Sequence, residues 1–137
     1  MTDCLFCKII AGEIPSEKVY EDEDVFAFLD IKPVNLGHAL VVPKKHCANL
    51  LDVDPETLKK TIAAIPKIAK AVMSAFDYQA FNLGVNNGAL AGQLVAHLHF
   101  HIIPRKEGDG HLLFPGKPYA SAEEMKNVGE KIRAKIV

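Results

Sequence analysis

Residues 94–104 form an otherwise apolar run in which three of the six histidines occupy alternate positions, so that polar and apolar residues alternate from 97 to 102. Alternation is the period of a β-strand, so His97, His99 and His101 are expected on one face and the apolar residues between them on the other. Alternate strand residues lie about 6.6 Å apart, which puts the outer two imidazoles about 13 Å apart, too far to share one metal ion. The pattern therefore predicts a strand with one chemical face and one core face.

Similar patterns predict four earlier strands. Residues 19–20 and 25–29 flank the polar turn 21–24 and are typical of a hairpin. A third strand is expected at 38–43, after a loop rich in Pro, Asn and Gly, and a fourth at 81–86. A glycine-bearing loop, 87–93, then leads into the histidine strand.

Three helical segments complete the pattern. A short turn is expected from Cys4 to Gly12, where the glycine ends it. Asp54 and Pro55 are typical of a helix start, and Pro66 is expected to kink the helix that follows. Its predicted buried face consists of Leu58, Ile62, Ile65, Ala69, Val72 and Phe76. A capping box of Ser121 and Glu124 predicts a last helix with an apolar stripe of Met125, Val128 and Ile132.

Strands joined by short loops, with helices appended, indicate an α+β domain in which helices cover one face of a five-stranded antiparallel sheet. The chain has 137 residues, of which 49% are hydrophobic, so we expect a single domain over 1–137 with a proper core.

Charge and cysteine content restrict the partners. The net charge of −1 gives no basic surface of the kind that nucleic-acid binding requires. No apolar run reaches the roughly 18 residues that span a bilayer, and the polar start at Met1 is not typical of a signal peptide. Three cysteines are too few for a disulfide framework. We expect a cytoplasmic protein that binds neither nucleic acid nor membrane.

The row of histidines favours chemistry at phosphorus. A single histidine is most simply a core residue, but three in register each need polar partners that an apolar strand does not supply. Neutral imidazole can act as a nucleophile or exchange protons near physiological pH. Backbone N–H groups around Gly88 and Gly92 are expected to approach phosphate oxygens.

The run from His97 to Ile103, His-Leu-His-Phe-His-Ile-Ile, resembles the signature of the histidine triad superfamily, most of all its Hint-type branch. The similarity covers 4–105, leaving the C-terminal helix and tail, 106–137, outside it. Its other motifs are Phe6-Cys7-Lys8-Ile9-Ile10, Ile14-Pro15, Phe28-Leu29-Asp30-Ile31, Gly37-His38, Val42-Pro43-Lys44-Lys45-His46, Asn86-Asn87-Gly88 and Gly92-Gln93. The resemblance implies the same α+β architecture and a homodimer whose two sheets join.

The resemblance also implies roles for particular residues. His99 would attack the α-phosphorus of a nucleotide and form a nucleotidyl-histidine intermediate, His101 would stabilise the phosphate, and His38 would face the site from another strand. Asp30 would bind the ribose hydroxyls, although a solvated strand end is the alternative. The implied base slot consists of Leu5, Phe6, Ile9, Phe28 and Ile31, for which ordinary core is the alternative. Further implied nucleotide-binding residues are Asn86, Gly92, Gln93, Leu94 and Val95; of these, Leu94 stands where many Hint-type members have a polar residue that addresses the leaving group.

Cys4 and Cys7 form a Cys-x-x-Cys pair, which alone is typical either of a metal site or of two small apolar residues at a helix start. Some bacterial histidine triad proteins with this pair bind structural zinc. The resemblance to them implies that His46 and His97 complete a tetrahedral set of ligands here. Two cysteines and two histidines would close such a site, so we expect no catalytic metal.

The expected function is that of a nucleotide-binding hydrolase or transferase acting on purine nucleoside phosphoramidates or related adenylated compounds, with AMP-like or GMP-like ligands. The alternatives are a dinucleoside polyphosphate hydrolase, a nucleotide-binding regulatory protein with incidental turnover and, more remotely, a zinc-dependent hydrolase.

Overall fold

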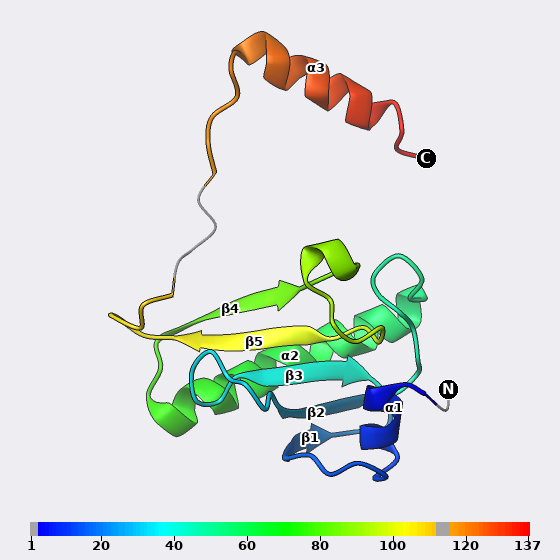
Figure 1. Ribbon diagram of the computed structural model, residues 1–137, viewed down its shortest axis with the longest axis vertical. Coiled ribbons are helices and arrows are strands. Elements are labelled where there is room, and N and C mark those ends of the chain that lie inside the picture. The colour runs from blue at the N-terminus through cyan, green and yellow to red at the C-terminus, as the bar shows by residue number, and fades with distance from the viewer. Residues whose placement is uncertain (1–2, 112–115) are drawn as a thin grey trace.

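The computed structural model describes residues 3–111 and 116–137 (Figure 1). Five strands form one antiparallel sheet in the order β1-β2-β3-β5-β4. The strands are β1 Lys18–Glu21, β2 Val25–Leu29, β3 Ala39–Pro43, β4 Ala80–Val85 and β5 Phe100–Arg105. The helices are α1 Leu5–Ile10, α2 Pro55–Phe76 and α3 Ala122–Arg133, with a short 3₁₀ turn, η1, at Ala89–Ala91. The predicted α+β class, with a five-stranded antiparallel sheet, is confirmed.

The histidine strand is shorter than its sequence pattern predicts. β5 begins at Phe100, and residues 95–97 form a bend in which the His97 N–H donates to the Val95 carbonyl. The Leu98 N–H then donates to the Cys47 carbonyl, outside the sheet. The prediction of three histidines on one strand was therefore wrong, because only His101 lies within β5. The alternation on the core side does hold, since Leu98, Phe100 and Ile102 are all buried in one cluster.

Helix α2 covers one face of the sheet and builds the main core with β2, β3 and β5 (Figure 1). Asp54 caps it as predicted: its carboxylate accepts from the Thr57 N–H at 2.9 Å. The helix continues through Pro66. The buried positions are Thr61, Ala64, Ile65, Ile68, Ala69 and Val72.

The predicted buried face of α2 was wrong at two positions. Ile62 is 41% exposed and Phe76 is 53% exposed. The helix presents Thr61 to the sheet in place of Ile62, and burial of this polar residue is possible because its hydroxyl donates to the Thr57 carbonyl at 2.8 Å. Phe76 ends the helix, where fewer neighbours cover its ring.

The opposite face of the sheet is covered over only part of its width. Helix α1, capped by Cys4, packs Phe6 and Ile9 on the β2–β3 half of this face. The cluster there consists of Phe6, Ile9, Phe26, Phe28, Leu40 and Val42, and we call it the α1 cluster. His101, on β5, points to this same face, next to the part that α1 covers.

Helix α3 is separate from both layers (Figure 1). Its predicted capping box forms, since the Ser121 hydroxyl accepts from the Glu124 N–H at 3.1 Å. Its predicted apolar stripe is not buried: Met125 and Ile132 are each 58% exposed. Within the described residues, no helix is long and apolar enough to cross a membrane.

Candidate functional site

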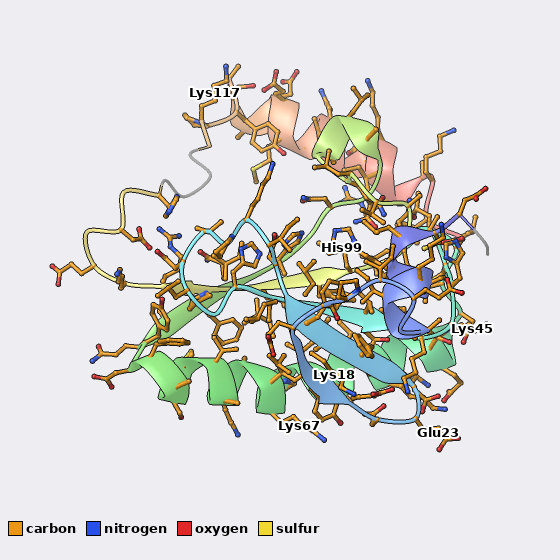
Figure 2. All side chains as sticks on the ribbon, turned by 60° about the horizontal axis from the view of Figure 1, so that its bottom comes forward. Lys18, Glu23, Lys45, Lys67, His99 and Lys117 are labelled. Carbon is orange, nitrogen blue, oxygen red and sulfur yellow. The ribbon has the colours of Figure 1, made fainter. Side chains whose placement is uncertain are left out.

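His99 lies just before β5, beside helix α1 (Figure 2). Its ring packs edge-on to Phe6, with ring centroids 5.1 Å apart, and stands 5.1 Å from the ring of His101. Its Nδ1 is 2.7 Å from the His97 carbonyl oxygen. A carbonyl can only accept, so Nδ1 carries the proton and Nε2 holds the free lone pair of the neutral ring.

The Nε2 atoms of His99 and His101 keep some contact with solvent, although His99 as a whole is only 7% exposed. Among the described residues, no buried side-chain nitrogen or oxygen lacks a hydrogen-bond partner. The Nε2 atoms of His99 and His101 have no such partner there, so both must be reached by water. The two residues therefore present neighbouring polar atoms to the open side of the sheet.

His38 joins this row from the end of the loop before β3. Gly37 precedes it with φ of 97°, a conformation that favours glycine, and a Cβ there would lie 3.1 Å from Val72. This explains the Gly-His pair in the sequence. The His38 ring is 4% exposed, and its Nε2 lies 2.9 Å from Nδ1 of His101.

Hydrogen bonds fix the tautomers of this histidine pair. The Val34 N–H donates to Nδ1 of His38 at 3.0 Å, so the His38 proton is on Nε2. The Asp30 carboxylate, 3.6 Å from that Nε2, favours the same tautomer. His38 must then donate to Nδ1 of His101, which leaves neutral His101 with its proton on Nε2. The row thus offers a lone pair on His99 and a donor on His101.

Burial keeps the two supporting imidazoles neutral. Burial, together with nearby His99 and His38, lowers the pKa of His101 to about 4, and burial lowers the pKa of His38 against the opposing effect of Asp30. Both act at neutral pH as hydrogen-bonding groups without charge.

The four predicted metal ligands Cys4, Cys7, His46 and His97 converge, with one ligand atom of each within 4.8 Å of all the others. Nδ1 of His46 and Nδ1 of His97 are 3.2 Å apart, and the distances from Sγ of Cys4 to His97 and of Cys7 to His46 are 3.4 Å and 3.5 Å. Tetrahedral ligation at about 2.3 Å for sulfur and 2.1 Å for nitrogen requires separations of about 3.4 Å to 3.8 Å. The four side chains can hold a metal ion.

The surroundings of these ligands also fit a metal. The Pro43 carbonyl lies 2.8 Å from Nε2 of His97, so that nitrogen carries the proton and Nδ1 is free to coordinate. The Cys7 N–H donates to Sγ of Cys4 at 3.3 Å, as expected for a ligating sulfur. Burial raises the pKa of the Cys7 thiol to about 11, so a metal must displace its proton on binding.

A second group, Asp30, His38 and His101, also has its ligand atoms within 4.8 Å of one another. The tautomers oppose metal binding there. Coordination through Nε2 of His38 would move its proton to Nδ1, which faces the Val34 N–H, and two donors would meet. We assign this group to hydrogen bonding.

The residues of the implied base slot divide by exposure. Phe6, Ile9 and Phe28 are buried in the α1 cluster, and Val95 packs against it. Leu5 is 42%, Ile31 93% and Leu94 94% exposed. Phe6, Ile9 and Phe28 therefore lie where ordinary core residues would lie, whereas the exposed side chains of Leu5, Ile31 and Leu94 are available to a ligand.

The loop between β4 and β5 uses its polar groups internally. The Gly88 N–H donates to the Gln93 side chain at 2.8 Å, and the Gly92 N–H donates to the Ala89 carbonyl. Gln93 donates in turn to the carbonyls of Ala48 and Val95. The N–H groups of Gly88 and Gly92 themselves are thus bound within the loop. The expectation that the N–H groups around these glycines approach phosphate stays a prediction. The Asn86 amide packs 3.5 Å from the position that a Cβ at Gly92 would take.

Sequence reasoning missed the residues that hold the histidine row from outside. The Val34 N–H, Asn35 and Asp109 connect His38 to the end of β5. A backbone N–H carries no sequence signal, and Asn35 in a Pro-Val-Asn-Leu-Gly loop is typical of any turn. Asn35 and Asp109 are far apart in the sequence, so the sequence gives no sign that their side chains form a hydrogen bond.

Three comparisons describe what the chain is similar to. The family model for the HIT domain matches residues 11–108. The chain is 54% identical over 109 residues to Protein hit of Bacillus subtilis, covering 79% of this chain and 75% of that protein. It is 41% identical over 135 residues to an adenosine 5'-monophosphoramidase of Schizosaccharomyces pombe, covering 97% and 98%. The crystal structure of a Zn-bound histidine triad family protein from Mycobacterium smegmatis superimposes with a TM-score of 0.76 at 35% identity, covering 98% and 99%.

Proposed function

The chain belongs to the HIT domain family, and from this premise we propose that it is a hydrolase or transferase acting at the α-phosphate of purine nucleoside phosphoramidates or related adenylated compounds. The observation that carries the proposal is the Nδ1–H of His99 bound to the His97 carbonyl, which leaves Nε2 as a nucleophile in contact with solvent. The similarity to an adenosine 5'-monophosphoramidase supports the choice of substrate.

His99 would act through a covalent intermediate. Its Nε2 lone pair attacks the α-phosphorus, the bond from phosphorus to the leaving group breaks, and the leaving group departs with the electron pair and takes up a proton. Water then attacks the same phosphorus, loses a proton and releases the nucleotide and the free imidazole. While phosphorus is attached, the ring is positively charged, and the Nδ1–H bond to the His97 carbonyl stabilises that charge.

The neighbouring groups would bind the nucleotide. The Nε2–H of His101 would donate to a phosphate oxygen, and His38 would hold that donor in place. Asp30 would bind the ribose, and the exposed Leu5 and Ile31 would contact the base. Asn86, Gly92, Gln93, Leu94 and Val95 would line the phosphate side of the site.

A second candidate function has one observation in its favour. Leu94 is apolar and 94% exposed, so its side chain cannot help to protonate an amine leaving group. A phosphate leaving group departs as an anion and needs no proton. Dinucleoside polyphosphates are therefore the second substrate class, and faster cleavage of diadenosine tetraphosphate than of a phosphoramidate would favour it.

We propose structural zinc as the metal held by Cys4, Cys7, His46 and His97. The support is the convergence of the four ligand atoms, all within 4.8 Å of one another, and the similarity to a Zn-bound relative. Zinc would tie helix α1 to the segment before β5, and a closed Cys₂His₂ set leaves no position for substrate. The cytoplasm, our expected location, would keep both thiols reduced.

We also propose the homodimer. Strand β4 is an edge strand with Phe81 and Leu83 38% and 47% exposed, and α3 leaves its apolar stripe uncovered. A second copy would cover such surfaces. Sedimentation of the purified protein as a monomer at micromolar concentration would contradict this.

The deciding experiment measures AMP release from adenosine 5'-phosphoramidate by the wild type and by His99→Ala, with melting curves and metal content showing that the variant is folded. The proposal expects turnover by the wild type and at least a thousandfold lower rate in the variant, because the nucleophile is gone. If neither protein turns over any substrate while both bind AMP, the hydrolase proposal fails and a nucleotide-binding regulatory protein takes its place.

A further inference from the structure

We propose that Asp109 and Asn35, which lie outside the histidine row, are positioning residues that set the tautomer of His38 and, through it, the proton that His101 presents to substrate. The carrying observation is that the Asp109 carboxylate binds the Asn35 side chain, while the backbone of Val34 and Asn35 binds His38, which in turn contacts His101. The inference rests on the function proposed above, since it concerns the same site.

Asp109 is an anion fixed to the end of β5. Its side chain is only 4% exposed. One carboxylate oxygen accepts from Nε of Arg105 at 2.7 Å, and the other accepts from Nη2 of Arg105 at 3.0 Å and from the His111 N–H at 3.1 Å. Arg105 holds the pKa of Asp109 well below its usual range, so the carboxylate remains charged. The group is thus an acceptor held by Arg105, which ends β5 four residues after His101.

Asn35 uses this acceptor to fix the loop before β3. Its Nδ2 donates to Oδ2 of Asp109 at 3.0 Å and to the Pro104 carbonyl at 2.9 Å, so both amide hydrogens are bound. The ring of His111 supplies a second attachment, because its Nε2 donates to the Val34 carbonyl at 3.2 Å. The loop is therefore attached to the segment following β5 at two neighbouring points, the Val34 carbonyl and the Asn35 side chain.

That stretch of backbone determines the state of His38. The Val34 N–H donates to Nδ1 of His38, and the His38 N–H donates to the Asn35 carbonyl at 3.0 Å. If the loop moves, Nδ1 loses its donor and can take the ring proton itself. Nε2 of His38 would then accept from His101, and the outer nitrogen of His101 would become a lone pair in place of a donor. A lone pair facing a phosphate oxygen repels it.

Asp109→Asn tests this directly, because every atom near the carboxylate is a donor. Nδ2 of the new amide would meet donors at either position: Arg105, Asn35 and the Lys106 N–H on one side, Arg105 and the His111 N–H on the other. The loop attachment must loosen. Asn35→Ala is the second variant, since it removes only the two loop bonds and leaves Arg105 paired.

The matched control is Asp22→Ala. The Asp22 carboxylate closes the β1–β2 turn by accepting from the N–H groups of Asp24 and Val25 and from the Tyr20 hydroxyl. Val25 pairs with Pro43, at the other end of β3 from His38. Loss of the Asp22 carboxylate removes a comparable set of loop hydrogen bonds. A purely structural effect would lower Tm in this control and in Asp109→Asn alike and would alter no histidine tautomer.

The readouts are long-range ¹H–¹⁵N NMR spectra of the imidazoles in the metal-loaded protein without substrate, and the split of kcat and KM. We expect Nε2–H tautomers of His38 and His101 in the wild type and in Asp22→Ala. Both Asp109→Asn and Asn35→Ala should show mixed tautomers and a fall in kcat of about tenfold, with KM changed less than twofold. Wild-type tautomers and unchanged kcat in both variants would overturn the inference. The spectra need no turnover, so they remain decisive even if the proposed hydrolase activity is refuted.

Discussion

Replacement of Phe6 separates two roles that the sequence left open for it, core residue and wall of the base slot. The side chain is 5% exposed and makes edge-on contacts with Phe28, His97 and His99 at centroid distances of 5.3, 5.9 and 5.1 Å. It is also the main anchor of α1, a helix of six residues that contains Cys7 and is capped by Cys4. Removing the ring should therefore weaken the fold, the metal site and the support of His99 together.

The magnitude follows from burial. A buried Phe→Ala change costs about 3 to 5 kcal/mol, and the lower end applies here because a short surface helix can settle into the space. A loss of about 3 kcal/mol in a domain of this size lowers Tm by about 10 °C. Phe6→Leu, which keeps most of the apolar volume, should cost about 1 kcal/mol.

The assay is thermal unfolding of Phe6→Ala, Phe6→Leu and the matched control Phe76→Ala, at equal metal loading. The control ring is 53% exposed at the end of α2, so its loss should cost about 1 kcal/mol. AMP titration of Phe6→Leu adds the second half of the test: a core residue predicts affinity within twofold of wild type, whereas a stacked base predicts a loss of about fivefold or more. If Phe6→Ala melts within about 3 °C of Phe76→Ala, the packing argument is refuted.

Three other perturbations have defined outcomes. Cys7→Ser should release the metal and lower Tm, and metal analysis that finds no zinc in carefully handled wild-type protein would remove the assignment. Because burial lowers the pKa of His101 to about 4, the folded state binds fewer protons than the unfolded state between pH 6.5 and 4; the stability tied to neutral His101 is complete above pH 6.5 and is lost as the pH falls. The free energy of unfolding of the wild type should therefore fall by about 2 kcal/mol more than that of His101→Gln between pH 7.5 and 4.5, after allowance for the partial exposure of the ring. Parallel curves of unfolding free energy against pH for the two proteins would contradict this. Asp54→Ala removes the cap of α2 and should cost about 1 kcal/mol in urea unfolding, with AMP release unchanged.

Local sequence signals were sufficient for much of the fold. The four strands before the histidine run, the Asp54 cap and the Ser121 capping box all depend on residues within a few positions of one another. The resemblance to the histidine triad signature implied the histidine row and four candidate metal ligands, and the structure brings those four side chains together from positions 4 to 97.

Tertiary contacts decided what periodicity could not. Residues 97–102 alternate like a strand, yet the Leu98 N–H donates to the Cys47 carbonyl outside the sheet, so β5 starts three residues after His97. Helix α3 has a regular apolar stripe, but among the described residues its Met125 and Ile132 remain 58% exposed. The face that α2 buries depended on where the sheet lies, which no helical period specifies.

The chemistry of the site divides in the same way. The sequence by itself determined which residue types are present and their spacing, because backbone period and capping are local properties of the chain. Only the tertiary structure decided the protonation of the imidazoles, since it brings Nε2 of His38 to Nδ1 of His101 and places the Val34 N–H on Nδ1 of His38. A proton position depends on the partner across a hydrogen bond, and for His38 and His101 those partners come from different segments of the chain.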